Sequence, residues 1–146
     1  MLCINCNNPN TRVTNSRPHK KQPRVWRRRH CPVCGTDFTT QEKPALDANI
    51  SVINSKTGVK QPFYQGELVY SIIRSFAHDE QFGINNALPL SETVITALMP
   101  VGDSIASQTI TDTCYQVLLR FDAAAATQYA LLHGIIAIPK RRRKGA

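Results

Sequence analysis

Four of the five cysteines form two Cys-x-x-Cys pairs, a spacing typical of tetrahedral zinc sites. The first pair opens the chain, and residues 7–30 separate it from the second. Asn7 and Gly35 follow the two pairs, and both tolerate the left-handed backbone that such turns require. Four thiolates close the coordination sphere, so no position remains for a reactive water. The sequence predicts one structural Zn²⁺ per chain, bound by Cys3, Cys6, Cys31 and Cys34.

The cysteines leave alternatives open. One alternative is that the four cysteines form two disulfides or are unrelated thiols, without a metal. Another is that His19 or His30 competes as a zinc ligand, although we expect His30 to face solvent or phosphate. The odd cysteine count favours a reducing compartment, and Cys114 is expected to be a small buried residue. The sequence has neither an apolar signal peptide nor a run of about 20 apolar residues. We therefore expect a soluble, cytoplasmic protein with no membrane partner.

A strongly basic segment lies between the two cysteine pairs and contributes to the net charge of +8. Such runs are often solvated surface, but here almost no acidic residue interrupts them, which favours a polyanion as partner. In a strand, Arg27 and Arg29 would share one face, and Arg28 would share the other with Trp26, which either packs inward or stacks on a base. The partner we predict is double-stranded DNA. The predicted DNA-binding residues are Arg12, Arg17, Lys20, Lys21, Arg24, Trp26, Arg27, Arg28 and Arg29.

The elements that must position these side chains divide the chain into three regions. Residues 1–45 contain too few aliphatic side chains to fold by apolar burial alone, so a metal must hold them together. Residues 46–138 carry the apolar runs of a packed domain, and residues 139–146 form a basic tail. The predicted fold class is α+β, with a small N-terminal β zinc ribbon followed by a mostly helical domain that contains a short β-hairpin.

The spacing of apolar residues predicts the elements of the second domain. Residues 50–53 and 61–64 are expected to pair as a hairpin, with Pro62 confined to an edge or a bulge. Pro89 and Ser91 indicate that one helix begins at Ser91. Amphipathic helices are expected over residues 66–78, over 91–99, from Ser104 or Ser107 to about 121, and over 123–133.

Several segments resemble the NrdR family of bacterial ribonucleotide reductase transcriptional repressors, in which a zinc ribbon is joined to an ATP-cone. The resemblance rests on Val-Thr-Asn-Ser-Arg at 13–17, on the arginine run and second cysteine pair at 27–35, on Phe-Thr-Thr-Gln-Glu at 38–42, and on residues 117–129. It implies that the second domain is an ATP-cone. It also implies a homo-oligomeric repressor at the bacterial nucleoid that senses ATP and dATP and binds operator DNA upstream of reductase genes.

The resemblance also implies a nucleotide site, and this chain departs from the family there. The family has a Lys-Arg-Asp-Gly-like turn where this chain has Asn-Ser-Lys-Thr-Gly at residues 54–58, and the carboxylate of Glu67 would repel phosphates. The alternative is a zinc-ribbon module that contacts RNA or RNA polymerase, with a degenerate cone that serves only for oligomerisation. No enzyme is expected, because P-loop, HExxH and Ser-His-Asp patterns are missing. The implied nucleotide-binding residues are Val52, Asn54, Lys56, Lys60, Gln61 and Glu67.

Overall fold

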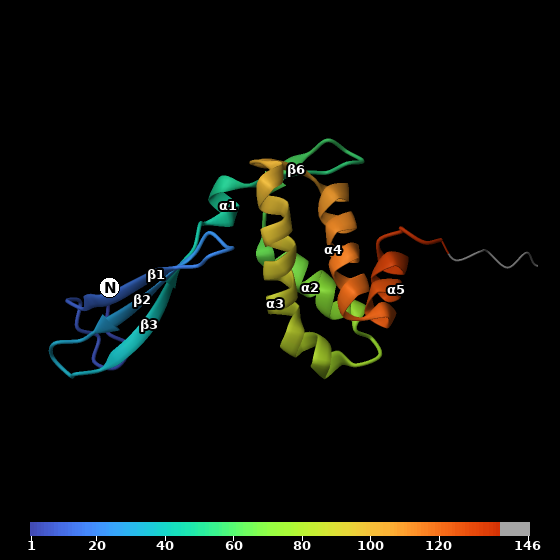
Figure 1. The fold of residues 1–146 in the computed structure, drawn as a ribbon. Coiled ribbons are helices and arrows are strands. Elements are labelled where there is room, and N and C mark those ends of the chain that lie inside the picture. The colour runs from blue at the N-terminus through green and yellow to red at the C-terminus, as the bar shows by residue number, and fades with distance from the viewer. Residues whose placement is uncertain (138–146) are drawn as a thin grey trace, which may run out of the picture. The chain divides into compact units, whose positions relative to one another are not determined.

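The computed structural model describes residues 1–137, so the predicted basic tail at 139–146 lies outside the described residues. The chain forms two compact units, Met1–Ala45 and Leu46–Ala146 (Figure 1). Strands dominate the first unit and helices the second, which confirms the predicted α+β class. Within residues 1–137, no helix is long and apolar enough to cross a membrane.

The first unit is a three-stranded antiparallel sheet. Strand β2 (Val25–His30) lies in the centre, between β1 (Arg12–Pro18) and β3 (Asp37–Glu42). The buried apolar cluster of this unit contains only Cys3, Cys31 and Phe38. A core of this size cannot offset the conformational entropy of about 45 ordered residues, so the unit needs another source of stability, as the sequence predicts.

A second small sheet belongs to the other unit and follows a short helix, α1 (Leu46–Asn49). Strands β4 (Ser51–Ile53) and β5 (Lys60–Pro62) form the predicted antiparallel hairpin, and Pro62 lies in an edge strand as expected. The sequence prediction missed β6 (Ser104–Ala106), which pairs in parallel with β4. Ser104 therefore lies in a strand and does not cap a helix.

Four helices pack around one apolar core. They are α2 (Gln65–Ser75), α3 (Glu80–Leu98), α4 (Ser107–Phe121) and α5 (Ala123–Leu132). A short 3-10 helix, η1 (Met99–Val101), follows α3. Figure 1 shows α3 and α4 side by side, with β6 at the end where α4 begins. Side chains from all four helices fill the core, with Ile72, Val94, Leu118 and Ala126 fully buried. Cys114 is also fully buried, as predicted.

The expected start of a helix at Ser91 is wrong, because α3 begins at Glu80 and passes through Pro89. A proline inside a helix removes one hydrogen bond and costs about 3 kcal/mol. Burial on both sides of the proline outweighs that cost. The buried stripe of α3 runs without interruption through Gly83, Ala87, Leu90, Ser91, Val94, Ile95 and Leu98.

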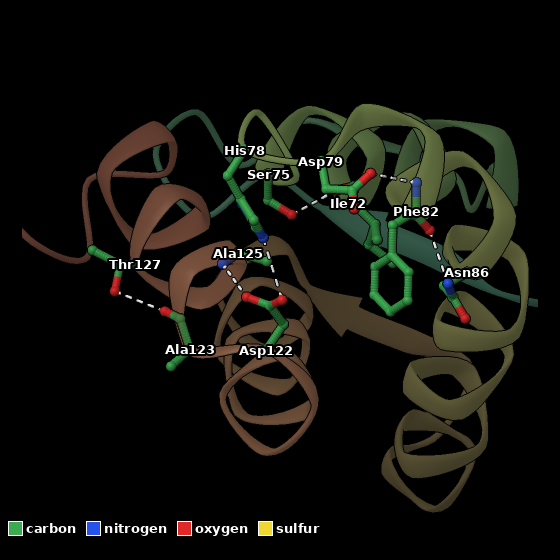
Figure 2. Close-up of polar contacts among 10 residues, drawn as sticks. All are labelled: Ile72, Ser75, His78, Asp79, Phe82, Asn86, Asp122, Ala123, Ala125 and Thr127. Atoms are coloured by element: carbon green, nitrogen blue, oxygen red, sulfur yellow. Dashed lines mark hydrogen bonds and ion pairs between the residues drawn. The ribbon is translucent and has the colours of Figure 1, made fainter.

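Two aspartates cap helices at the end of this unit where α4 meets α5. The Oδ1 atom of Asp79 accepts a hydrogen bond from the Phe82 N–H at 3.0 Å, and Oδ1 of Asp122 accepts one from the Ala125 N–H at 2.8 Å (Figure 2). The other carboxylate oxygen of Asp122 lies 3.3 Å from His78 Nε2. The bond from Ala125 is the main cause that lowers the pKa of Asp122.

We predict that Asp122→Ala destabilises the second unit by about 1 kcal/mol, because α5 loses its N-cap. Asp122 caps the helix as a carboxylate, and its pKa is lowered in the folded state. Its contribution to the free energy of unfolding is therefore fully present above the ordinary aspartate pKa, and it is lost as the pH falls through the lowered folded-state pKa. Urea unfolding followed by circular dichroism at pH 7 and pH 3 measures this. Asp112→Ala, which removes an exposed helical aspartate that only accepts a bond from Gln108 Nε2, is the matched control. Equal losses for the two variants would refute the capping role.

Candidate metal centre and nucleic-acid interface

The four cysteine sulfurs of the first unit converge on one point. The Sγ atoms of Cys3 and Cys34 are 3.6 Å apart, as are those of Cys6 and Cys31. All four sulfurs lie within 4.8 Å of one another. A tetrahedral Zn²⁺ with bonds of about 2.3 Å places its ligand sulfurs about 3.8 Å apart, so the cluster fits a four-thiolate zinc site.

The backbone of the two turns explains why the sulfurs meet. The Asn7 N–H donates to the Cys3 carbonyl at 3.1 Å, and the Gly35 N–H donates to the Cys31 carbonyl at 2.9 Å. Asn7 has φ of 57° and Gly35 has φ of 71°, so both residues adopt the left-handed backbone expected from the sequence. The two turns therefore close in the same way, and each presents a pair of thiols to the other.

Hydrogen-bond donors around Cys31 and Cys34 favour the ionised form of these two thiols, which is the form that binds metals. At Cys6 the Asn8 backbone N–H acts in the same direction, but the neighbouring thiols and burial outweigh it and raise the pKa to about 12. The hydroxyl and the backbone N–H of Thr36 lower the pKa of Cys34 to about 5. The Cys34 N–H is the main cause that lowers the pKa of Cys31, and the Asn8 side-chain amide donates to the same sulfur at 3.7 Å. His30 instead contacts Asp37, with Nδ1 2.9 Å from Oδ1, and His19 contacts the Lys21 N–H. The structure thus groups only cysteines at the centre.

The predicted alternation along β2 is confirmed. Trp26 lies opposite Arg17 in β1, and Arg28 lies opposite Asn15 in β1 and Thr39 in β3. Directly opposed residues share a face of a sheet, so these five side chains lie on one side of the ribbon. They line a shallow groove of about 360 Å³, and the Trp26 side chain is exposed. We call this surface the groove face.

The other face of the ribbon holds Arg27 and Arg29, which were predicted to bind DNA together with Arg28. Arg27 forms an ion pair with Glu42, with Nη2 2.7 Å from Oε2. Arg29 donates from Nε to the Thr40 hydroxyl at 3.4 Å and from Nη1 to the Thr11 hydroxyl at 3.5 Å. Both arginines are partly buried, so each has partners within the ribbon itself.

The remaining predicted DNA-binding residues lie at the two ends of the sheet. Lys20, Lys21 and Arg24 belong to the turn between β1 and β2, and Nη1 of Arg24 lies 3.5 Å from the Gln41 amide oxygen. Arg12 is exposed at the start of β1, opposite His30. Sequence reasoning did not select Asn15 and Thr39, because neither carries a charge and only the strand register brings them beside Arg28.

The second unit contains a cavity of about 390 Å³ between the small sheet, α2, α4 and the end of α5. Its lining includes five of the six residues implied for nucleotide binding, which are Val52, Asn54, Lys56, Gln61 and Glu67. Lys60 does not line it and is exposed in β5.

The polar floor of this cavity was not foreseen. Ser71, Gln108, Thr111, Tyr129 and His133 line it. They come from α2, α4, α5 and the C-cap of α5, which only tertiary packing brings together. The His133 ring stacks on Tyr129 with centroids 4.1 Å apart, and its Nε2 lies 2.7 Å from the Ser71 hydroxyl. Burial raises the pKa of Tyr129, so this phenol stays neutral and serves as a hydrogen-bonding group.

A four-cysteine ribbon with a cationic groove face, followed by a helical unit with a cavity, defines a zinc-ribbon protein with a separate second domain. Residues 1–42 match the family model of the N-terminal domain of NrdR-like transcriptional repressors. The chain belongs to the NrdR family of transcriptional repressors, which are regulators and not enzymes.

Relatives named transcriptional repressor NrdR support this assignment along most of the chain. The relative from Ligilactobacillus salivarius is 30% identical over 134 residues, which cover 91% of this chain and 83% of the relative. The relative from Neisseria meningitidis is 33% identical over 138 residues, covering 91% and 85%. A third, from Thermus thermophilus, is 38% identical over 73 residues, covering 50% and 46%. The ribbon match and the sulfur cluster together support a structural zinc.

We predict that Cys31→Ser removes the metal and unfolds the first unit, because three buried residues cannot hold it. Mass spectrometry of the native protein should find one zinc per unsubstituted chain and none in the variant. Amide resonances of residues 1–45 should move to random-coil positions, while those of the second unit keep their dispersion. Cys114→Ala is the matched control, since this thiol is buried away from the cluster and its loss should leave zinc content unchanged. A dispersed ribbon spectrum without zinc would contradict the prediction.

Proposed function

We propose that this chain is a repressor of ribonucleotide reductase genes that binds operator DNA through the groove face of its zinc ribbon. One observation carries the proposal: Arg17, Trp26 and Arg28 lie side by side on an exposed face, with no carboxylate directly opposite them in the sheet. Arg28 does lie 3.6 Å from Asp37, but both side chains are about half exposed, so solvent screens this pair and DNA can displace it.

The groove face and the turn at its end have different tasks in this proposal. Lys20 and Lys21 are exposed cations and would contact phosphates, which gives affinity without sequence information. Arg17 and Arg28 suit bidentate contacts to guanine, and Trp26 supplies an apolar surface between them. Arg27 and Arg29 would act mainly by holding the three strands together, because Glu42, Thr40 and Thr11 already engage them.

We predict that Arg28→Ala weakens operator binding by about 5- to 100-fold, the loss expected for one bidentate base contact. Fluorescence anisotropy with duplexes from upstream of reductase genes, and with scrambled duplexes, measures affinity and specificity over a range of salt concentrations. Arg120→Ala removes an equal charge from an exposed position on α4 and should change little. Equal losses for the two variants, or equal binding of the unsubstituted chain to scrambled DNA, would refute base reading by the groove face.

The proposal includes control by ATP or dATP bound in the cavity of the second unit. Apolar side chains, including Val52, Phe63 and Ile110, offer a surface for a base, and the polar floor offers hydrogen bonds. Lys56 is positioned to attract phosphates, whereas Glu67 repels them. Both side chains are exposed, which moderates each effect through screening.

Nucleotide binding would change the oligomeric state through the second unit, and oligomers would align two or more ribbons with repeated half-sites on DNA. The resemblance to the family supports this scheme, in which the protein acts in the bacterial cytoplasm, at the nucleoid. It needs no enzymatic step, because ligand binding alone shifts an assembly equilibrium when the nucleotide prefers one assembly over another.

We predict that Lys56→Gln weakens ATP and dATP binding by about tenfold, because the cavity loses its attraction for phosphate, and that Glu67→Gln strengthens it. Calorimetric titration gives the affinities, and light scattering on the same samples gives the mass of the assembly. Lys60→Gln is the matched control, because this lysine lies outside the cavity. If Lys56→Gln and Lys60→Gln lower the affinity equally, then general charge and not position explains the effect.

A second candidate function is favoured by Glu67 and by the altered turn at 54–58. In this reading the second unit serves only for assembly, and the ribbon contacts RNA or RNA polymerase. A chain that ignores both nucleotides and prefers RNA to duplex DNA would establish this alternative and would reject the proposal above.

A further inference from the structure

Two serines from distant parts of the second unit are joined by a closed set of hydrogen bonds. The Ser55 N–H donates to Oγ of Ser107 at 3.0 Å, and the Ser107 hydroxyl donates to Oγ of Ser55 at 3.1 Å. The same Ser55 oxygen accepts the Gln108 N–H at 3.1 Å. We call these three bonds the serine clasp.

The clasp extends the pairing of β4 with β6 beyond the ends of both strands. Ile53 lies opposite Ala106, and the clasp joins the residues that follow on each side. Ala106 occupies the N-cap position of α4, and its side chain makes no capping bond. Ser55 therefore supplies from another segment an acceptor that a helix usually obtains from its own N-cap residue.

Ser55 also begins the turn that carries Lys56. Oδ1 of Asn54 accepts the N–H groups of Lys56 and Thr57 at 2.9 and 3.0 Å, so the turn is ordered from within. Next to the pairing of β4 with β6, the clasp bonds this turn directly to the first turn of α4. Ser55, Lys56, Ser107 and Gln108 all line the cavity, so the clasp lies at the cavity wall itself.

We propose that the serine clasp is the positioning element of the nucleotide cavity, which fixes Lys56 where the phosphates of a nucleoside triphosphate bind. The inference rests on the proposed binding of ATP or dATP. Among residues 1–137, Lys56 is the only lysine or arginine that lines this cavity, so affinity depends on where that charge lies. A turn that is already ordered loses less conformational entropy when the ligand binds than a mobile one does.

The clasp also connects the ligand to a helix. Phosphates would attract Lys56 and restrict the motion of its turn. Because the clasp bonds this turn to α4, the first turn of α4 would become less mobile as well. Nucleotide binding should therefore slow hydrogen exchange at the amides of Ser107 and Gln108, beyond the immediate surroundings of the turn. The same protection should be absent when either serine hydroxyl is removed.

The test compares ATP and dATP affinities of the full, zinc-loaded chain by calorimetry. Ser55→Ala removes the oxygen that accepts two of the three bonds. Because only part of that loss changes the position of Lys56, binding should weaken by about 2- to 10-fold, the range that corresponds to one net hydrogen bond. Ser55→Thr keeps the hydroxyl and should restore most of the affinity. Thr57→Ala is the matched control, because it removes a hydroxyl from the same turn that accepts only the Val59 N–H and does not line the cavity.

Two double variants separate positioning from a general effect on folding. Ser55→Ala should have almost no further effect when Lys56 is already glutamine, because the clasp acts through that charge. Ser55→Ala with Ser107→Ala should resemble either single variant, since the two hydroxyls belong to one set of bonds. An undiminished loss in the Lys56→Gln background, or an equal loss in Thr57→Ala, would overturn the inference.

The failure of the inference differs from the failure of the proposed function. If the unsubstituted chain binds neither nucleotide, nucleotide control is refuted and the clasp has no ligand to position. If the unsubstituted chain binds and Ser55→Ala binds equally well, only the clasp is refuted. Thermal melting of each variant shows whether the second unit remains folded at the temperature of the titration.

Discussion

The four-sulfur cluster is the constraint on which the first unit depends. With only Cys3, Cys31 and Phe38 in its buried apolar cluster, the sheet gains too little from burial to order about 45 residues without the metal. The two left-handed residues, Asn7 and Gly35, close the turns that aim the thiols. The groove face, and with it the base contacts proposed for Arg17 and Arg28, therefore depends on that cluster.

The sequence was most informative where chemistry or a local period determined the structure. The cysteine spacing predicted the cluster, and strand alternation placed Trp26 and Arg28 on the same face. Long-range packing supplied what the sequence concealed. Strand β6 exists because β4 pairs with it, and α3 passes through Pro89 because the buried stripe continues on both sides. No local signal reveals either fact.

The arginine run shows why residue type alone overstates a binding site. Strand alternation separated Arg28 from Arg27 and Arg29, yet all three were predicted to bind DNA because all carry the same charge. The structure shows that Glu42, Thr40 and Thr11 engage Arg27 and Arg29, whereas Arg28 lies on the groove face. The cavity gives a similar lesson. Its five implied residues come from one stretch of chain, whereas Tyr129 and its neighbours reach the floor only through packing.

The groove face of a single ribbon is small, and under the proposed function this would make control through assembly effective. A few cations and one tryptophan would give modest affinity to a lone ribbon, whereas two ribbons in one assembly would bind as a unit, the second at a high effective concentration. A nucleotide that changes the number of chains in the assembly would then change operator affinity strongly. This change would be far larger than any effect of the nucleotide on the DNA affinity of one ribbon. Under this scheme, the cavity need not contact the ribbon to control it. The positioning of Lys56 by the serine clasp would then be the first step, because it decides how tightly the nucleotide binds. The change would reach the assembly through α4.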